Sequence, residues 1–140
     1  MTLEIEHLSG GYGQLTVLND VSFTVPDGHL TALVGLNGSG KSTTINHIIG
    51  LLAPKQGSIV LNGVTLQTQP EAFKRQIAYI PEQPVLYDEL TLREHLALTI
   101  SVYQLDEKTA WQRAEELLTT FRLDNKLDWF PTHFSKGMRQ

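Results

Sequence analysis

The chain has 140 residues, 41% of them hydrophobic and 19% charged, which is typical of a globular protein with one core. Its 15 acidic and 11 basic residues give a formal net charge of −4, and the basic residues are scattered. Proteins that bind nucleic acid through its phosphates usually carry a basic excess, so we expect no nucleic-acid partner. The absence of cysteine excludes disulfides and thiolate chemistry. Because no apolar run could span a bilayer and residues 1–6 lack the pattern of a signal peptide, we expect a cytoplasmic location.

The N-terminal third predicts strands followed by a helix. Residues 3–6 and 21–25 alternate between apolar and polar side chains, as half-buried strands do, and residues 26–28 (Pro-Asp-Gly) predict a turn. Residues 30–34 form a short apolar run that predicts a buried strand. We expect a helix over residues 41–52, closed by a proline at position 54.

The middle of the chain predicts a hairpin and one more strand. Asn62 and Gly63 stand between apolar residues, which is a strong hairpin signal. Residues 76–80 predict another buried strand, which Pro81 ends because proline lacks a backbone N–H.

From Thr91 onward the apolar residues follow a helical period. Thr91 and Glu94 have the spacing of a capping box, so a helix is expected to begin there. A second helix is expected after Asp106. The predicted apolar faces are Leu92, Leu96, Ile100 and Tyr103 in the first helix, and Trp111, Ala114, Leu118 and Phe121 in the second.

Residues 35–42 match the phosphate-loop pattern G-x-x-x-x-G-K-[ST] at every fixed position. Glycines let the backbone curl around a phosphate, and the following helix offers its free N–H groups and positive dipole end to the same anion. We expect Lys41 to reach the β- and γ-phosphates and the Ser42 hydroxyl to ligate Mg²⁺. The predicted nucleotide-binding residues here are Gly35, Leu36, Asn37, Gly38, Ser39, Gly40, Lys41, Ser42 and Thr43, with ATP and Mg²⁺ as cofactors. Kinases, GTPases and transport ATPases all share this pattern, so the flanking residues must decide between them.

The run Gly-Leu-Asn-Gly-Ser-Gly-Lys-Ser-Thr-Thr at residues 35–44 closely resembles the Walker A segment of ATP-binding cassette (ABC) proteins. Tyr12 lies upstream where that family places an aromatic residue that stacks on adenine. The resemblance therefore implies that Tyr12 contacts the nucleotide base. The alternative is an ordinary tyrosine at the end of a strand.

Residues 80–87 resemble the Q-loop of the same family, whose glutamine helps to ligate Mg²⁺. Aligned on Pro81, that position is Glu82, and Gln83 follows one residue later. A carboxylate is a good hard-oxygen ligand for Mg²⁺, so we favour Glu82, although a shift of the loop by one residue would give the role to Gln83.

Residues 134–140 resemble the ABC signature motif, usually Leu-Ser-Gly-Gly-Gln, with Ser135 and Gly137 in matching places and Lys136 and Met138 replacing Gly and Gln. In this family the signature of one subunit closes over the nucleotide of a second subunit. The resemblance thus implies a head-to-tail dimer in which Ser135 and Gly137 contact nucleotide. The alternative is a plain helix cap by Ser135.

The four motifs occur in the family's order, and together they are most similar to the Ecs-type ATPase subunit of ABC transporters. The implied fold is α/β: an incomplete P-loop NTPase (RecA-like) core with an N-terminal antiparallel β subdomain and an α-helical subdomain. We expect one domain over residues 1–140, with the β subdomain and P-loop core in residues 1–85 and the Q-loop end, helical subdomain and signature in residues 86–140.

The resemblance also implies a function and a location. The expected role is that of an ATP-binding and ATP-hydrolysing subunit that energises a membrane-spanning partner, with export as the expected direction, at the cytoplasmic face of the membrane. A soluble ABC ATPase that acts on ribosomes or DNA is the alternative. A P-loop kinase is a third class, which the signature-like residues disfavour.

The 140 residues contain no counterpart of the family's Walker B strand, catalytic glutamate or switch histidine, so no catalytic residue is assigned within them. Phosphoryl transfer to water needs Mg²⁺ held by a Walker B carboxylate and an oriented water. We therefore expect these residues alone not to turn over ATP. A steady-state ATPase assay on the purified 140-residue chain tests this, and turnover that Lys41→Ala abolishes would contradict it.

Overall fold

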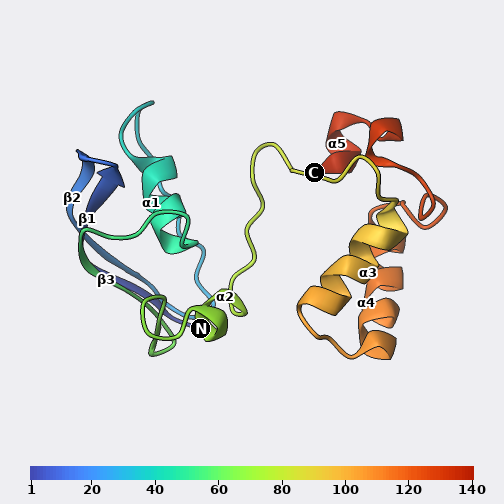
Figure 1. Cartoon of the computed structure of the whole chain (residues 1–140), viewed down its shortest axis with the longest axis horizontal. Coiled ribbons are helices and arrows are strands. Elements are labelled where there is room, and N and C mark those ends of the chain that lie inside the picture. Colours follow the sequence, from blue (N-terminus) through green and yellow to red (C-terminus); the bar gives the residue numbers. More distant parts are fainter. The chain divides into compact units, whose positions relative to one another are not determined.

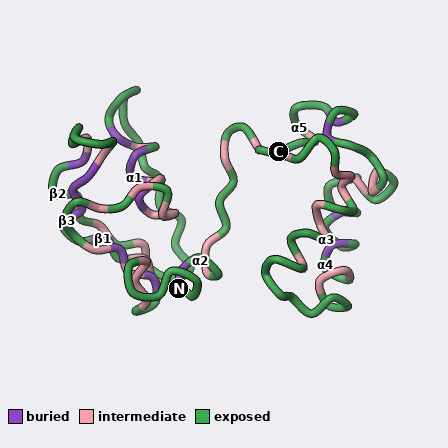
Figure 2. Tube along the Cα trace, in the orientation of Figure 1, coloured by how far each residue is buried: buried purple, intermediate pink, exposed green.

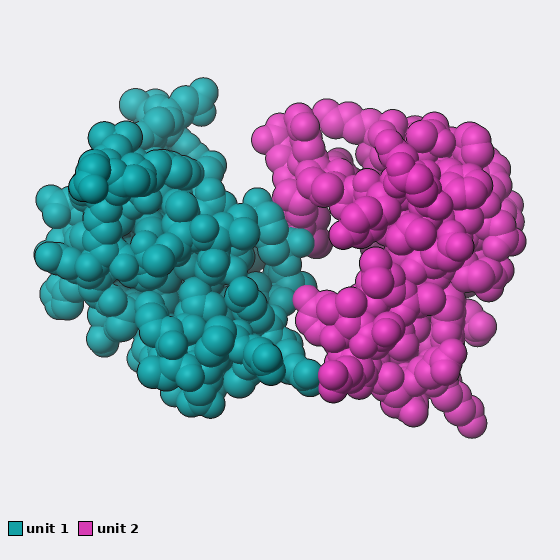
Figure 3. Space-filling view, in the orientation of Figure 1, with its two compact units in different colours: residues 1–79 teal, residues 80–140 magenta.

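The computed structural model describes all 140 residues, and they form two compact units, residues 1–79 and residues 80–140 (Figure 3). The predicted subdomain boundary at residue 85 stays a prediction.

Unit 1 (residues 1–79) combines an antiparallel sheet with two helices (Figure 1). Its elements are β1 (Leu3–Tyr12), β2 (Leu15–Val25), α1 (Lys41–Ile48), β3 (Gln56–Leu61), β4 (Val64–Thr65) and α2 (Pro70–Lys74). The strand order is β2-β1-β3-β4, and every neighbouring pair is antiparallel. The alternation predicted at residues 3–6 and 21–25 is confirmed, because both segments lie in strands with alternating burial.

The core of unit 1 lies between this sheet and the two helices. Figure 2 shows its buried residues along the strands and on α1. The buried apolar residues are Ile5, Leu8, Leu18, Ile59, Leu61 and Phe73. Leu8, Ile59 and Phe73 are each 0% exposed. Burial of each such side chain stabilises the fold by about 1.5–3 kcal/mol relative to leaving it exposed.

Strands β1 and β2 are irregular where they face each other. His7 and Asp20 both have left-handed backbone angles, with φ of 51° and 54°, at register shifts of the pair. His7 Nδ1 lies 2.6 Å from Asp20 Oδ1. This hydrogen bond and the charge of Asp20 raise the pKa of His7 above its usual value. The bulges bend the hairpin whose far end carries Tyr12.

The hairpin predicted at Asn62 and Gly63 is confirmed. These residues join β3 to β4, with Leu61 paired to Val64. Their φ values of 51° and 77° are those of a type I′ turn, which asparagine and glycine adopt at low cost.

Two strands predicted to be buried are not strands, and those predictions are wrong. Residues 30–34 have no regular secondary structure, and residues 76–80 leave α2 through a turn; neither segment belongs to the sheet. Leu30 is 100% exposed, Val34 88% and Ile80 80%. An apolar run is buried as a strand only where a neighbouring strand pairs with it, and none of the four strands is paired with either segment.

Helix α1 is shorter than the predicted span of residues 41–52. It ends at Ile48, because Gly50 takes a left-handed φ of 77° and the N–H of Leu51 donates to the carbonyl of Asn46 at 2.9 Å. This Schellman arrangement satisfies carbonyls at the end of the helix. The glycine, rather than the more distant proline, ends α1.

Unit 2 (residues 80–140) is helical. Its elements are α3 (Leu92–Val102), α4 (Glu107–Thr120), a 3₁₀ turn η1 (Pro131–His133) and α5 (Lys136–Arg139). The predicted helix starts are confirmed: Thr91 and Glu94 form a complete capping box, and Asp106 caps α4 by accepting from the Thr109 N–H. No helix of the protein combines the length and the apolar composition needed to cross a bilayer.

The predicted apolar faces of these two helices are only partly buried. No residue of α3 is fully buried, whereas Ala114 and Leu118 of α4 are 7% exposed each. Phe121 was expected on the same face but is 68% exposed, so that prediction is wrong. Phe121 is the C-cap of α4, and its side chain at the end of the helix is left mostly uncovered.

The capping box of α3 gives a stability prediction. Replacing Thr91 by alanine should lower the free energy of unfolding by about 1 kcal/mol, because an N-cap hydroxyl satisfies an orphan backbone N–H. Urea unfolding followed by circular dichroism measures this. Thr99→Ala is the matched control within α3, since its hydroxyl only donates to the carbonyl of His95, and it should cause no loss.

The same cap predicts a pH dependence. Hydrogen bonds from the Thr91 backbone N–H and hydroxyl hold the pKa of Glu94 below its usual value. A carboxyl with a lowered folded-state pKa adds stability at neutral pH, and that contribution is lost as the pH falls through the folded-state pKa. The difference between wild type and Thr91→Ala should therefore shrink in acid. A difference that grew in acid would contradict this assignment.

Candidate nucleotide-binding site

The predicted phosphate loop leads directly into α1 of unit 1 (Figure 1). A turn within it is closed by the N–H of Ser39, which donates to the carbonyl of Leu36 at 3.2 Å. Gly38 and Gly40 have φ values of 82° and 91°, a region that side chains with a Cβ rarely adopt. Two of the loop's glycines, one of them at a variable position of the pattern, are thus favoured by the backbone itself.

Lys41 is held against the loop. Its Nζ donates to the carbonyls of Gly35 at 2.8 Å and Leu36 at 2.7 Å. A Cβ at Gly35 would lie 2.5 Å from the hydroxyl oxygen of Ser39, so a larger residue there would force the Ser39 side chain to move. The ammonium group therefore already lies at the loop, where a phosphate would need a cation.

The first turn of α1 offers an anion site. Its N-cap, Gly40, makes no side-chain cap, and the turn contains no acidic residue, so no protein carboxylate competes for the free N–H groups and the positive dipole end. Ser42 is exposed in this turn. Thr43 is only 6% exposed, so it offers a backbone N–H rather than its hydroxyl. The threonine that follows, Thr44, is also buried and donates to the carbonyl of Gly40 at 3.0 Å.

These residues fit ATP with Mg²⁺. The loop supplies backbone N–H groups and one ammonium for phosphate oxygens, and the exposed Ser42 hydroxyl is a hard oxygen ligand of the kind Mg²⁺ takes. Nothing lies within 4 Å of a Cβ built on Gly38, so the loop leaves open space at that point.

Tyr12 ends β1 in the same unit and is 49% exposed. Its hydroxyl accepts a hydrogen bond from Asn46 Nδ2 at 3.3 Å. Asn46 belongs to α1, four residues after Ser42, and residues four apart share a helix face. Sequence reasoning missed Asn46, and that spacing was the signal that could have found it.

The other predicted site residues lie in unit 2. Glu82, together with Gln83 and Pro84, lines a pocket with the basic side chains of Lys136 and Arg139. The backbone carbonyl of Glu82 accepts from the side-chain amide of Gln140 at 3.1 Å. Neither Glu82 nor Gln83 is buried, so the structure leaves both available as the Q-loop residue.

Ser135 and Gly137 lie at α5. The Ser135 hydroxyl accepts from the N–H of Met138 at 3.4 Å, so the residue caps this short helix, as the plainer sequence alternative states. No atom lies within 4 Å of a Cβ built on Gly137, which leaves its backbone accessible. The structure thus groups Tyr12 with residues 35–43 in unit 1, and Glu82 with Ser135 and Gly137 in unit 2.

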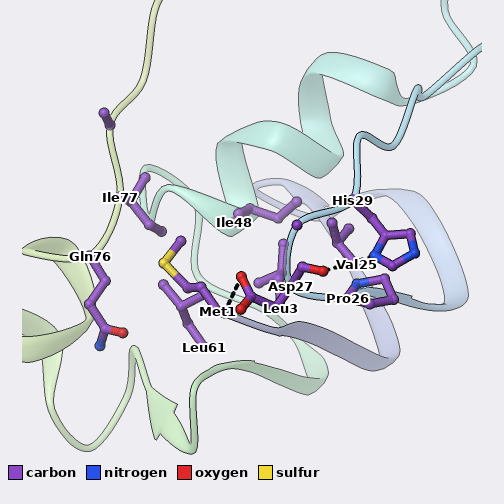
Figure 4. A pocket seen from close by; sticks show the side chains of 12 residues that line it. Met1, Leu3, Val25, Pro26, Asp27, His29, Ile48, Leu61, Gln76 and Ile77 are labelled. Atoms are coloured by element: carbon purple, nitrogen blue, oxygen red, sulfur yellow. Dashed lines mark hydrogen bonds and ion pairs between the residues drawn. The ribbon is translucent and has the colours of Figure 1, made fainter.

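Another hollow of unit 1, of about 380 Å³, is a different feature (Figure 4). Its lining includes Leu3, Ile48, Leu61 and Ile77 and is mostly apolar. Neither Tyr12 nor the phosphate loop contributes to it, so it is separate from the candidate phosphate site.

The loop, its lysine and the following helix define a P-loop nucleotide-binding protein. The sequence profile of the family described as ABC transporter matches residues 18–140, so the chain belongs to the ABC transporter family of ATP-binding subunits. The predicted fold class is confirmed. A solved structure described as the ATP-binding subunit of an ABC transporter is 55% identical in sequence and superposes with a TM-score of 0.93. The match covers 99% of this chain and 58% of the chain of that structure.

Two curated relatives agree with this assignment. The ABC-type transporter ATP-binding protein EcsA of Bacillus subtilis is 54% identical over 99% of this chain and 56% of its own length, which confirms the predicted similarity to Ecs-type subunits. The sulfate/thiosulfate import ATP-binding protein CysA of Synechocystis is 36% identical over 100% of this chain and 39% of its own length. The chain thus spans about half the length of the relatives it matches.

The backbone of Gly38 gives a binding prediction with an internal control. Gly38→Ala places a Cβ at a left-handed position, which costs about 1–2 kcal/mol of stability and shifts the phosphate loop. Gly28→Ala meets the same backbone penalty at φ 70°, in a turn outside the loop. Isothermal titration with Mg-ATP should show weaker binding for Gly38→Ala by about tenfold or more and no change for Gly28→Ala. Equal losses in both variants would mean that the loop is not the site.

Proposed function

We propose that the protein is the energising subunit of an ABC transporter, which binds Mg-ATP and, in the intact protein, hydrolyses it. The observation that carries this proposal is the phosphate loop, with Lys41 bonded to the carbonyls of Gly35 and Leu36 ahead of the uncapped start of α1. Membership of the ABC transporter family supports the ATP-binding role.

Each residue of the site has a proposed task. Backbone N–H groups of the loop and of the first turn of α1 bind the phosphate oxygens, and Lys41 moves from the loop carbonyls to the β- and γ-phosphates. Tyr12 stacks on the base through its exposed ring. Ser42 and either Glu82 or Gln83 would hold Mg²⁺, which when bound neutralises charge on the phosphate oxygens.

A second copy of the subunit completes the site in this proposal. Ser135 and Gly137 would contact the nucleotide bound to a partner subunit in a head-to-tail dimer. The accessible backbone of Gly137 and the basic side chains of Lys136 and Arg139 nearby suit a phosphate ligand. Lys136 replaces the neutral glycine usual in the signature motif, and Arg139 follows the motif directly.

The proposed partner is a membrane-spanning subunit at the cytoplasmic face of the membrane, and export is the proposed direction. Residues 85–87 follow the Q-loop residue and are the proposed contact. Val85 is 91% exposed and Tyr87 60%, so both side chains are available to a partner surface. The likeness to the ABC-type transporter ATP-binding protein EcsA supports a transporter role.

Lys41 provides the test of the ATP-binding site. Lys41→Ala should weaken Mg-ATP binding by about 10- to 100-fold, because hydrogen bonds to a charged group contribute more than neutral ones. Isothermal titration calorimetry measures the affinity, and Lys74→Ala, an exposed lysine on α2, is the matched control. Wild-type affinity in Lys41→Ala, or an equal loss in the control, would overturn the proposal.

A further inference from the structure

The second turn of α1 contacts the end of β1 that carries Tyr12. Asn46 Nδ2 donates to the Tyr12 hydroxyl at 3.3 Å, which joins residues 34 positions apart in the sequence. The Asn46 side chain is partly buried, and the Tyr12 ring keeps 49% of its surface exposed. The hydrogen bond thus fixes the hydroxyl end of the ring while leaving ring surface open to a ligand.

The next residue of α1 fixes the backbone of β1. His47 is 0% exposed, and a Cβ built on Gly10 would lie 2.5 Å from its Nε2. Its Nδ1 lies 3.0 Å from the carbonyl of Leu52, so the proton is on Nδ1, and Nε2 has no hydrogen-bond partner. The imidazole therefore packs directly on the strand two residues before Tyr12, where only glycine leaves room for it.

The segment after α1 holds the hairpin turn that follows Tyr12. The N–H of Lys55 donates to the carbonyl of Ser9 at 2.9 Å. Lys55 Nζ lies 3.1 Å from the carbonyl of Gln14 and 3.3 Å from the hydroxyl of Thr16. Both sides of Tyr12 in the sequence are therefore tied to α1 or to the loop that leaves it.

We infer that Asn46 is a positioning residue for Tyr12. By holding the tyrosine, Asn46 affects how strongly the nucleotide base contributes to binding, and it does not contact the phosphates. The inference rests on the proposed function. Helix α1 offers phosphate donors in its first turn and holds Tyr12 from its second turn, so one rigid element fixes the separation of the two subsites. Asn46 then acts on the base subsite only, because its side chain bonds the tyrosine and not the loop.

The test compares a ligand that has a base with one that lacks it. Affinities for Mg-ATP and for inorganic tripolyphosphate with Mg²⁺ are measured by isothermal titration calorimetry for wild type, Asn46→Leu, Tyr12→Phe and the double variant. Asn19→Leu, at an exposed position of β2, is the matched control. Unfolding curves of each variant verify that the chain is folded.

The positioning role predicts a specific pattern. Asn46→Leu and Tyr12→Phe should each weaken ATP binding about 2- to 10-fold, which is the change in affinity expected from the loss of one neutral hydrogen bond. Both variants should leave tripolyphosphate binding unchanged. The double variant should be no weaker than either single variant, because both remove the same bond. Additive losses, or equal losses for the two ligands, would overturn the inference.

The same experiment separates this inference from the proposed function. Lys41→Ala should weaken both ligands, since the lysine serves the phosphates. If Lys41→Ala changed neither affinity, the proposed ATP site would be wrong. If Lys41→Ala behaved as expected while Asn46→Leu left ATP affinity unchanged, only the positioning role of Asn46 would fail.

Discussion

The packing of α1 against β1 is the contact on which the rest of unit 1 depends. His47 is fully buried over Gly10, and the strand can approach this closely only because the residue at position 10 has no Cβ. At the other end of the helix, Gly40 lies against Leu18 of β2. Because both ends of α1 are anchored to the β1–β2 hairpin, the phosphate loop and Tyr12 share one rigid frame.

Local chemistry made several elements predictable from the sequence. The capping box at Thr91 and the Asn62-Gly63 turn each involve only three or four residues. Their local sequence patterns are therefore enough to predict the start of α3 and the β3–β4 hairpin. The phosphate loop is similar, because its glycines at positions 38 and 40 are required by positive φ angles of the loop itself.

Long-range contacts were not predictable in the same way. The apolar runs at residues 30–34 and 76–80 indicated burial, but burial of a strand depends on a neighbour that a local pattern does not specify. The bond between Asn46 and Tyr12 joins two segments whose proximity follows from the fold of the whole unit. The end of α1 was missed for a simpler reason, since Gly50 was a nearer stop signal than the proline.

The central claim is that the phosphate loop and Tyr12 form two subsites for one nucleotide. Titration of the ¹⁵N,¹³C-labelled protein with Mg-ATP, followed by nuclear magnetic resonance of backbone amides and aromatic rings, tests it most directly. Backbone amide signals of residues 35–43 and ring signals of Tyr12 should shift together with one dissociation constant, while tripolyphosphate should shift the loop signals alone. Shifts confined to residues outside these segments, or a Tyr12 response identical for both ligands, would contradict it.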